Sequence, residues 1–463
     1  MKKTLPGIAF IAILFITIIT LSGCLKEEAQ APITFTPLVV TQNIVAEVGQ
    51  TTAQSGGVVV DNGGSEILSL GVCWSSTNQT PTVADSKTVD ALTYNAYTSS
   101  LTGLTANTTY YVRAYATSAS GTGYGTVITF KTNATAAIIT ANVSTIAGST
   151  TPGKVDGPGA GALFDGPEAL AFNPATGNLY IGDTFNNSIR TMTTTGTVAT
   201  LTNGTLGFAN GPLASALFYG PKGFAFDAQG NTYVADMGNH LIRKITPGGV
   251  VSTFSGLTLP GYIDGDATVA KYNNPVSVAI DGSGNAYIAD RFNNVIRKST
   301  SAGVVSSLAG YSGSVGSGLV DATGANAKFK TTSAIAINAA GTKLYVADRD
   351  NNAIRVINIA DAAVTTLAGG TKFPDLIGSP TALTIDAQDN LFITDQSGRI
   401  FEITAAGVLY KLAGALKTSG NANGAGATAR FNNPQGIAKD AAGNVYVADF
   451  GNNSIRKIAI TVQ

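Results

Sequence analysis

The sequence "DTFNNSIR" (Asp183–Arg190) returns along the chain as a series of near copies, and this repetition decides the fold. The other copies are "DMGNHLIR" from Asp236, "DRFNNVIR" from Asp290, "DRDNNAIR" from Asp348, "DQSGRIF" from Asp395 and "DFGNNSIR" from Asp449. A residue that serves one reaction is needed once, whereas a residue that every structural unit needs recurs in each unit. We therefore expect the six Asp residues to be structural, because each carboxylate can accept backbone N–H groups within its turn.

Each copy lies in a unit of four strand-like runs, and the units follow one another at a spacing of roughly 50 residues, within the range of propeller repeats. In the third unit the runs are "PVSVAID", "NAYIAD", "VIRKST" and "VVSSLAG". The turns that begin at Asp227, Asp281, Asp386 and Asp440 are expected to be tight hairpins rather than calcium loops. Four strands per unit predict an all-β fold built as a β-propeller.

The units, of which "GNVYVADFGNNSIRKI" at residues 443–458 is typical, are similar to NHL repeats, and the likeness spans residues 143–463. The resemblance implies an NHL-like β-propeller. Six runs of outer-strand type occur, yet the first, Val143–Gly148, has no blade before it, and the last unit lacks an outer strand. We therefore expect Val143–Gly148 to complete the blade that contains Asp449, which closes six blades into a ring without open edges.

Two other repeated residue types are expected to pack the blades. The Arg near the end of each copy can pair with a repeat carboxylate, with the neighbouring blade as one location for that partner. An aromatic residue precedes each blade and is expected to wedge between blades (Phe164, Phe218, Tyr272, Phe329, Phe431). The fifth unit departs from the pattern, because its copy is one residue short and Phe401 replaces the Arg. We expect that blade to pack differently at its rim.

A separate β-domain is expected over residues 33–133. The run "YYVRAYATSASGTGYGTVITFKT" from Tyr110 alternates apolar and polar residues, as half-buried strands do. Leu104 and Tyr110 resemble the tyrosine corner of fibronectin type III domains, and this resemblance implies an immunoglobulin/fibronectin type III-like sandwich. Residues 134–142 are interpreted as a linker. The sandwich is expected to act as a spacer, with glycan binding as the alternative, and its removal is expected to leave the propeller intact.

The N-terminal residues predict where the protein is located. Lys2 and Lys3 precede a short apolar run that ends in "LSGC", which resembles a bacterial lipobox, so residues 1–23 are interpreted as a lipoprotein signal peptide. The resemblance implies lipidation of Cys24 and a tether over residues 24–32. The adjoining "CLKEE" resembles the export signal of Bacteroidetes surface lipoproteins. We expect a cell-envelope protein that is lipid-anchored to the outer membrane and exposed at the cell surface, with a periplasm-facing anchor as the alternative.

The composition argues against several classes of function. The chain has 463 residues with 28 basic and 28 acidic side chains, and this zero net charge gives no footprint for nucleic acid. His240 is the only histidine, and it stands where other copies have Asn, so a turn role is expected. The common nucleophile, zinc-protease and phosphate-loop motifs do not occur. No cofactor and no metal site are expected. The remaining cysteine, Cys73, is expected to be a small buried apolar residue.

Two candidate sites lie on the face that carries the repeated turns. The first is a patch of residues from blades three and four that the repeat does not explain: Tyr262, Arg291, Phe292, Tyr311, Arg349 and Asp350. Such a mixture of rings and charges suits a sugar or a peptide. The alternative is the mouth of the axial channel, where the innermost strands begin with Glu168, Lys222, Val276, Ser333, Thr381 and Gln435.

Three functions are consistent with these observations. The favoured one is a non-catalytic envelope lipoprotein whose propeller binds a glycan or a protein ligand on its loop-rich face. The second is a metal-dependent hydrolase or lyase of the six-bladed type, for which the axial residues offer only one carboxylate, Glu168. The third is a purely structural or adhesive envelope protein.

Overall fold

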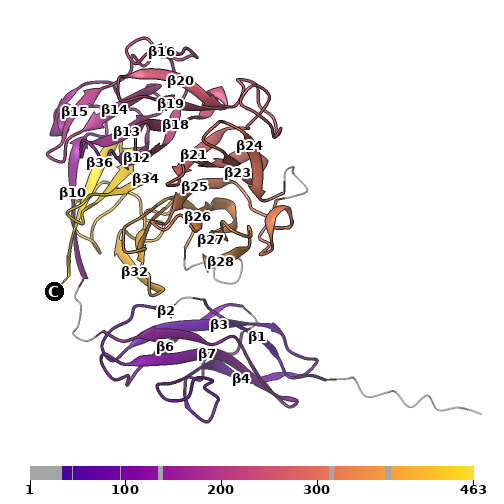
Figure 1. The fold of residues 1–463 in the computed structure, drawn as a ribbon. Coiled ribbons are helices and arrows are strands. Elements are labelled where there is room, and N and C mark those ends of the chain that lie inside the picture. Colours follow the sequence, from indigo (N-terminus) through magenta and orange to yellow (C-terminus); the bar gives the residue numbers. More distant parts are fainter. Residues whose placement is uncertain are drawn as a thin grey trace, which may run out of the picture.

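The computed structural model describes residues 34–43, 45–93, 95–133, 139–311, 317–370 and 377–462. These residues form an all-β structure in which the only helical segments are short 3₁₀ turns. Figure 1 shows two parts: a ring of sheets and, beneath it, a smaller domain from the N-terminal third of the chain. The predicted signal peptide and the lipidation site at Cys24 lie outside the described residues.

Six four-stranded antiparallel units, which we call blades one to six, make up the described part of the ring. In order from the axis outward, their strands have these bounds: β12 (Pro167–Phe172), β13 (Leu179–Asp183), β14 (Ser188–Met192) and β15 (Thr197–Thr200); β17 (Pro221–Phe226), β18 (Thr232–Asp236), β19 (Leu241–Ile245) and β20 (Val250–Ser255); β21 (Pro275–Ile280), β22 (Ala286–Asp290), β23 (Val295–Ser299) and β24 (Val305–Ala309); β25 (Thr332–Ile337), β26 (Lys343–Asp348), β27 (Ala353–Asn358) and β28 (Val364–Gly369); β29 (Pro380–Ile385), β30 (Leu391–Asp395), β31 (Ile400–Ile403) and β32 (Val408–Ala413); β34 (Pro434–Lys439), β35 (Val445–Asp449), β36 (Ser454–Val462) and β10 (Ile139–Gly148).

The ring closes in blade six, which combines β10, the first strand of the ring in sequence, with β36, the last. Strand β10 pairs antiparallel with β36, as the sequence analysis expects, and Val143 lies opposite Ile458. The strand begins at Ile139, so four residues assigned to the linker belong to blade six instead. Each innermost strand contacts the innermost strands of both neighbouring blades, and β34 contacts β12. The outer strand of the last blade is therefore supplied by the segment that precedes the first blade.

The repeated turn after the second strand of each blade is organised around the buried Asp. In blade one, Asp183 Oδ1 accepts a hydrogen bond from the backbone N–H of Asp165 at 2.8 Å. Its Oδ2 accepts from Asn186 at 2.8 Å and from Arg190 at 2.7 Å. The same three bonds recur at the equivalent positions of blades two, three, four and six: Asp236, Asp290, Asp348 and Asp449. A common structural task accounts for the repetition.

The Arg of each copy pairs within its own blade, which corrects the suggestion that its partner is in the neighbouring blade. Arg190 and Asp183 belong to paired strands of one sheet, and both side chains are fully buried. The second amino group of Arg190 binds Asp156 at 2.6 Å. The buried ring of Phe164 lies 5.2 Å from the guanidinium carbon. In blades one to four and in blade six, the aromatic residue before the blade therefore packs on a buried cation.

Blade-to-blade contact is made by the residue that ends each repeated turn. This residue has a left-handed backbone, a conformation that Asn adopts more readily than most residues. Asn187 Oδ1 accepts from the backbone N–H of Gly220 in the next blade at 3.0 Å. His240 Nδ1 accepts from Asn274 at 3.1 Å in the same way. Asn453 accepts from Gly166 at 3.0 Å and so joins blade six to blade one.

The N-terminal domain consists of two sheets that pack face to face. Its strands are β1 (Leu38–Thr41), β2 (Val45–Ala46), β3 (Ala53–Asp61), β4 (Ile67–Ser75), β5 (Ser86–Lys87), β6 (Tyr97–Leu101), β7 (Thr109–Ser118), β8 (Gly121–Tyr124) and β9 (Ile128–Lys131). Strands β1, β2, β3 and β6 form one sheet, and β4, β5, β7, β8 and β9 form the other. Tyr110 accepts a hydrogen bond from the backbone N–H of Thr105 at 2.8 Å, as in a tyrosine corner. Cys73 is buried, and burial raises its pKa to about 11.

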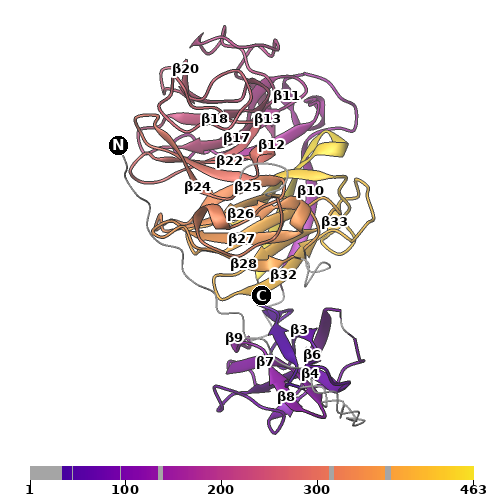
Figure 2. The ribbon, with the colours of Figure 1, turned by 90° about the vertical axis from the view of Figure 1, so that its right-hand side faces the viewer.

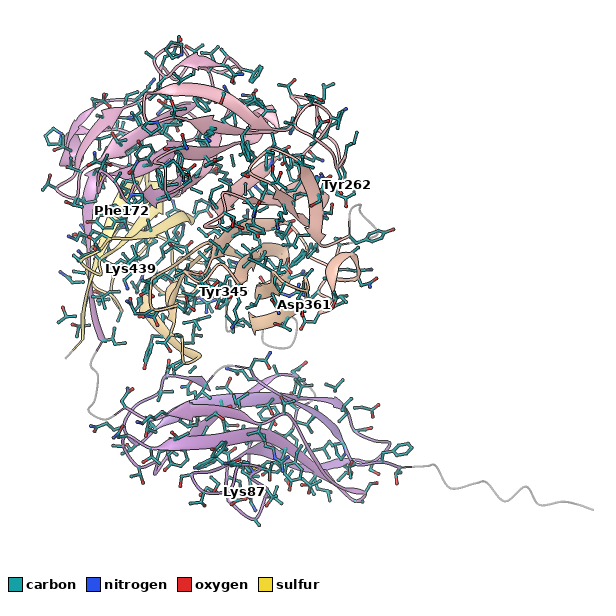
Figure 3. All side chains as sticks on the ribbon, viewed as in Figure 1. Lys87, Phe172, Tyr262, Tyr345, Asp361 and Lys439 are labelled. Atoms are coloured by element: carbon teal, nitrogen blue, oxygen red, sulfur yellow. The ribbon has the colours of Figure 1, made fainter. Side chains whose placement is uncertain are left out.

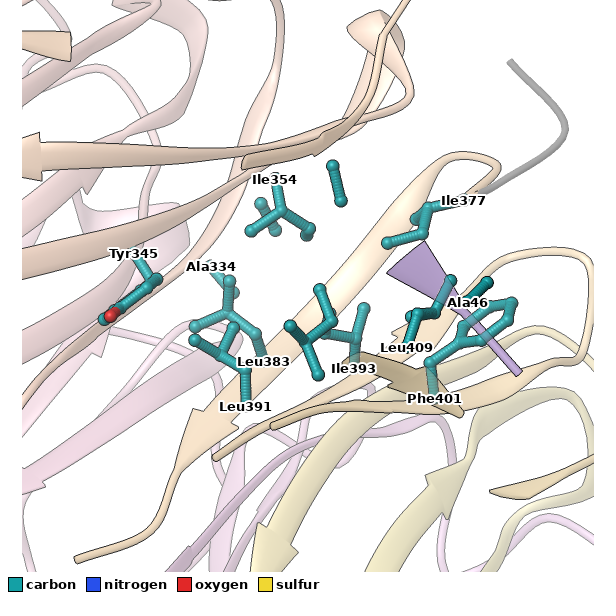
Figure 4. Packing of buried hydrophobic residues seen from close by; sticks show 13 residues of the cluster. Ala46, Ala334, Tyr345, Ile354, Ile377, Leu383, Leu391, Ile393, Phe401 and Leu409 are labelled. Carbon is teal, nitrogen blue, oxygen red and sulfur yellow. The ribbon is translucent and has the colours of Figure 1, made fainter. Parts of the chain in front are cut away.

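This domain docks on blade five rather than standing apart from the ring. Strand β2 pairs in parallel with β32, the outer strand of blade five, so one sheet runs through both parts. Figure 2 shows the domain directly below that side of the ring. Figure 4 shows Ala46 among Phe401, Leu409 and Ile377 of blade five. The domain is therefore in contact with the ring, and its expected role as a spacer stays a prediction.

Blade five differs from the other blades at its outer edge, because no described residue of the loop before it pairs with β32. In blades one, two and six, a two-residue strand from the loop before the blade pairs with the outer strand: β11 (Gly157–Pro158), β16 (Gly211–Pro212) and β33 (Gly424–Ala425). Single bridges at Gly265 and Thr323 do the same in blades three and four. In blade five, β2 takes this place. An unpaired outer strand would otherwise present open N–H and C=O groups.

None of the helical turns in the described residues has the length and apolar character that a membrane-crossing helix needs.

Candidate functional site

The candidate site is a channel of about 340 Å³ on the axis of the ring, lined by the innermost strands of all six blades. Its volume lies in the range of small-molecule pockets. The six residues predicted at the start of the innermost strands all line it: Glu168, Lys222, Val276, Ser333, Thr381 and Gln435. Figure 3 labels Phe172 and Lys439, the last residues of β12 and β34, near the axis. We call the end with Glu168 and Lys222 the mouth and the end with Phe172 and Lys439 the far end.

The strands can converge on the axis because their third residues are small. These residues are Ala169, Gly223, Ser277, Ala334, Ala382 and Gly436. A Cβ at Gly223 would lie 2.6 Å from the Cα of Ser277 in the next blade, which is closer than packed carbon atoms come. A Cβ at Gly436 would meet the backbone oxygen of Glu168 at 2.6 Å. Close approach of blades therefore fixes the position of the mouth residues.

Two of the mouth residues form a partly buried ion pair. Lys222 Nζ lies 2.7 Å from Glu168 Oε2, and each side chain is 13% exposed. Burial lowers the pKa of Lys222, whereas the Glu168 carboxylate acts in the opposite direction. The pair joins the inner strands of blades one and two across the channel.

Two arginines reach the mouth from the repeated turns of blades three and four. Arg291 begins the 3₁₀ turn η3 (Arg291–Asn293), and Arg349 begins η6 (Arg349–Asn351); both side chains line the channel. Arg349 donates a hydrogen bond to Gln396 Oε1 at 2.9 Å. No described residue accepts a hydrogen bond from the Arg291 side chain, whose Nε is buried. Burial, and next the charge of Arg349, lower the pKa of Arg291.

The neutral groups of the mouth join neighbouring blades. Ser333 Oγ donates to the backbone oxygen of Pro380 at 2.8 Å, and Thr381 Oγ1 donates to that of Pro434 at 2.6 Å. Gln435 Nε2 donates to Asn433 Oδ1 at 2.8 Å. Each hydroxyl oxygen can still accept a hydrogen bond, and the side-chain carbonyl of Gln435 is an acceptor as well. The mouth therefore offers charged donors and neutral acceptors side by side.

The structure divides the six residues of the predicted loop patch between different places. Arg291 and Arg349 line the channel together with the axial residues. Tyr262, labelled at the outer part of the ring in Figure 3, stacks on the buried Arg297 at 4.9 Å. Phe208 stacks on Arg243 in the same way in blade two, so Tyr262 is a repeated residue and not a unique one.

The other three residues of that patch are on the surface. Phe292 is 57% exposed, and Tyr311 is 53% exposed. The carboxylate of Asp350 accepts a hydrogen bond from Thr331 at 2.7 Å. None of the three lines the channel as described.

The residue that follows each repeat Asp is a feature that the sequence analysis used only in part. These residues are Thr184, Met237, Arg291, Arg349, Gln396 and Phe450. The Asp is constant, whereas the next residue varies and is Arg only in blades three and four. A variable residue directly after a constant Asp is the sequence pattern that could have identified these positions as candidate site residues. The same pattern includes Gln396, which accepts a hydrogen bond from Arg349.

Within the described residues, no group of three or more His, Cys, Asp or Glu side chains could hold a metal ion. His240 serves as the blade-to-blade acceptor described above, and its burial lowers its pKa.

Comparison with known proteins gives the class of fold. Residues 431–458 match the NHL repeat. The chain is 28% identical over 320 residues to teneurin-3 of Danio rerio, a match that covers 62% of this chain but only 10% of teneurin-3. The chain therefore spans a small part of that relative.

Two solved structures share the fold over nearly the whole chain. One is an auxiliary nutrient binding protein from Bacteroides thetaiotaomicron, with 15% identity, a TM-score of 0.52, and coverage of 91% of this chain and 98% of that one. The other is an auxiliary nutrient binding protein from Bacteroides ovatus, with 14% identity, the same TM-score, and coverage of 92% and 98%. The chain thus contains an NHL repeat and has the all-β, propeller-like fold of these proteins.

Proposed function

We propose that this protein is a non-catalytic binding protein of the cell envelope, a six-bladed NHL-type propeller that holds a glycan at the mouth of its axial channel. One observation carries the proposal. The repeated Asp, Asn and Arg residues make contacts within and between blades, whereas the inner-strand residues at the mouth are of a different type in each blade: Glu168, Lys222, Val276, Ser333, Thr381 and Gln435. Variation on a rigid scaffold is typical of binding sites.

The comparisons support this role without deciding it. The two Bacteroides proteins of similar fold are named as auxiliary nutrient binding proteins, and we propose the same general role for this chain. At about 15% identity the likeness extends to the fold alone. The proposal therefore depends on the mouth of this chain and not on the relatives.

The proposal includes the attachment of the protein to the outer membrane. Residues 1–23 would act as the signal peptide, Cys24 would carry the lipid, and residues 33–133 would form a fibronectin type III-like domain between the anchor and the ring. Two or more acyl chains hold a protein firmly at a bilayer. Cys24→Ser should move the protein from the membrane fraction to the soluble fraction, and unchanged fractionation would contradict the anchor.

A blocked channel tests the binding function. The half-buried side chain of Gln435 lines the mouth, and Gln435→Trp would fill it. Gln388 is exposed on the hairpin between β29 and β30, at the far end of the ring, so Gln388→Trp is the matched control. Both variants and the wild-type protein would be screened against arrays of glycans and peptides.

We expect a glycan to bind the wild-type protein and the Gln388 variant but not the Gln435 variant. Equal binding by all three proteins would place the ligand outside the channel. A stoichiometric Ca²⁺ or Zn²⁺ ion bound in the channel would favour the hydrolase alternative instead.

A further inference from the structure

The charged residues that line the mouth are unequal in sign. Lys222, Arg291 and Arg349 line it, and Glu168 is the one carboxylate among the described residues of its lining. A fourth cation, Lys439, lies at the far end and is paired with Asp386 at 2.5 Å. The exposed Asp350 is the other acidic group close to Arg291, but it does not line the channel. The mouth therefore carries an excess of positive charge.

Within the described residues, Arg291 is the cation of the mouth for which no hydrogen-bond acceptor is present. Its guanidinium has five N–H donors, yet none donates to a described residue, and Nε is shielded from solvent. The exposed ring of Phe292 lies 5.5 Å from its guanidinium carbon. By contrast, the five buried repeat arginines each bind a carboxylate: Arg190, Arg243, Arg297, Arg355 and Arg456. A partly buried, unpaired guanidinium is costly unless a ligand supplies the acceptor.

The neutral and charged side chains around Arg291 together favour a ligand that carries both an acidic group and hydroxyl groups. Arg349 is held by a neutral amide and keeps its full charge available to a second oxygen. Ser333, Thr381 and Gln435 offer acceptors for hydroxyl groups beside the cations. An acidic peptide would form ion pairs with the cations but would leave these neutral acceptors without hydrogen bonds.

We infer that the mouth binds an acidic sugar, whose carboxylate is held by the Arg291 guanidinium between Arg349 and Lys222. The inference rests on the proposed binding function and specifies the chemistry of its ligand. Arg is the side chain best suited to bind a carboxylate through two parallel N–H bonds. The sugar hydroxyls would contact Ser333, Thr381 and Gln435.

The test compares a galacturonic acid trimer with the same trimer after methyl esterification, by calorimetry on the full chain. Esterification removes the charge and leaves the ring and its hydroxyls unchanged. The wild-type protein should prefer the free acid. Arg291→Gln should weaken binding of the free acid about tenfold or more, because hydrogen bonds to charged groups contribute strongly. Lys330→Gln removes one exposed positive charge beside the turn of blade four and should leave the affinity within about twofold.

A second variant predicts an effect of opposite sign. Glu168→Gln removes the lining carboxylate and frees Lys222, so it should strengthen binding of the free acid. A variant that only damaged the fold could not bind more tightly. Thermal unfolding would show whether Arg291→Gln remains folded.

The outcomes separate this inference from the proposed function. Binding of the methyl ester as tight as that of the acid, with no effect of Arg291→Gln, would overturn the inference while leaving a glycan-binding channel. Binding of an oligo-aspartate peptide in place of any uronic acid would overturn it as well. Absence of binding to every glycan would overturn both.

Discussion

At the scale of one residue, His240 makes the free energy of unfolding of the ring depend on pH. His240 Nδ1 accepts a hydrogen bond from the backbone N–H of Asn274, where other blades use an Asn side chain. Only a neutral imidazole can accept this bond. Burial lowers the pKa of His240 below that of a free imidazole. The folded state therefore disfavours protonation, and the unfolded state binds the proton more readily.

The pH dependence follows from that difference. The stabilisation by His240 is fully present above pH 6.5 and is lost as the pH falls through the lower pKa of the folded protein. His240→Asn should keep the acceptor and remove this dependence, so that the melting temperature between about pH 5 and 7 falls less than in the wild-type protein. Equal slopes in calorimetric scans across this range would contradict the account.

The repeat Asp carries a second prediction at the level of one residue. Asp290 is fully buried, and it binds Arg297 at 2.9 Å and Asn293 at 2.8 Å. Asp290→Ala would leave Arg297 buried with one carboxylate partner fewer, and it should lower the unfolding free energy by about 3–5 kcal/mol. Asp281→Ala, in the hairpin turn at the far end, removes only local hydrogen bonds and should cost about 1 kcal/mol. Urea unfolding measures both, and similar losses would show that the repeat Asp has no special role.

Blade five keeps the buried ion pair of the repeat but supplies its arginine from another position. Ile377 and Phe401 occupy the positions of the aromatic residue and the Arg in other blades, and both are buried in one cluster. Arg399 now reaches Asp395 from four residues away, at 2.8 Å. The difference expected for this blade from Phe401 is therefore present, although the compensating Ile377 was not foreseen.

Strand β10 carries the prediction at the level of an element. A chain that starts at Ile139 retains the whole strand, whereas a chain that starts at Gly153 lacks it and leaves β36 as an open edge of blade six. The shorter chain should lose its cooperative unfolding transition or melt well below the longer one, because the edge exposes unpaired backbone groups. Both chains lack the N-terminal domain, so the comparison isolates closure. Identical melting curves would contradict the closed ring.

At the level of the whole molecule, docking of the N-terminal domain changes what its removal should do. Strand β2 covers the outer edge of blade five, and Asn43 donates a hydrogen bond to Thr366 of blade four at 2.8 Å. A chain that starts at Ile139 should therefore be less stable than the full chain, with faster hydrogen exchange in β31 and β32. The sequence analysis expected an intact ring after this removal. Exchange rates in blade five that match those of the full chain would restore that expectation.

Much of this organisation was predictable because it repeats. Each blade requires a buried Asp, a turn residue with a left-handed backbone and a small third residue in the inner strand. The corresponding sequence pattern therefore recurs along the chain. The docking of β2 could not be predicted, because it depends on contacts between distant parts of the chain, such as those of Ala46 with Leu409, that occur once and in no repeat. The residues that follow the strand starts line the channel, and their role in binding stays a prediction. The absence of a partner for Arg291 depends on side-chain direction, which no spacing reveals.

The most direct test of the central claim is hydrogen exchange of the full chain with and without the galacturonic acid trimer. A ligand at the mouth should slow exchange in the turns that carry Arg291 and Arg349 and in the first residues of the innermost strands, because bound oxygens and excluded water protect those amides. The far-end hairpins and the N-terminal domain should keep their rates. Protection confined to the outer loops or to the N-terminal domain, or no protection in any peptide, would contradict a binding site at the mouth of the channel.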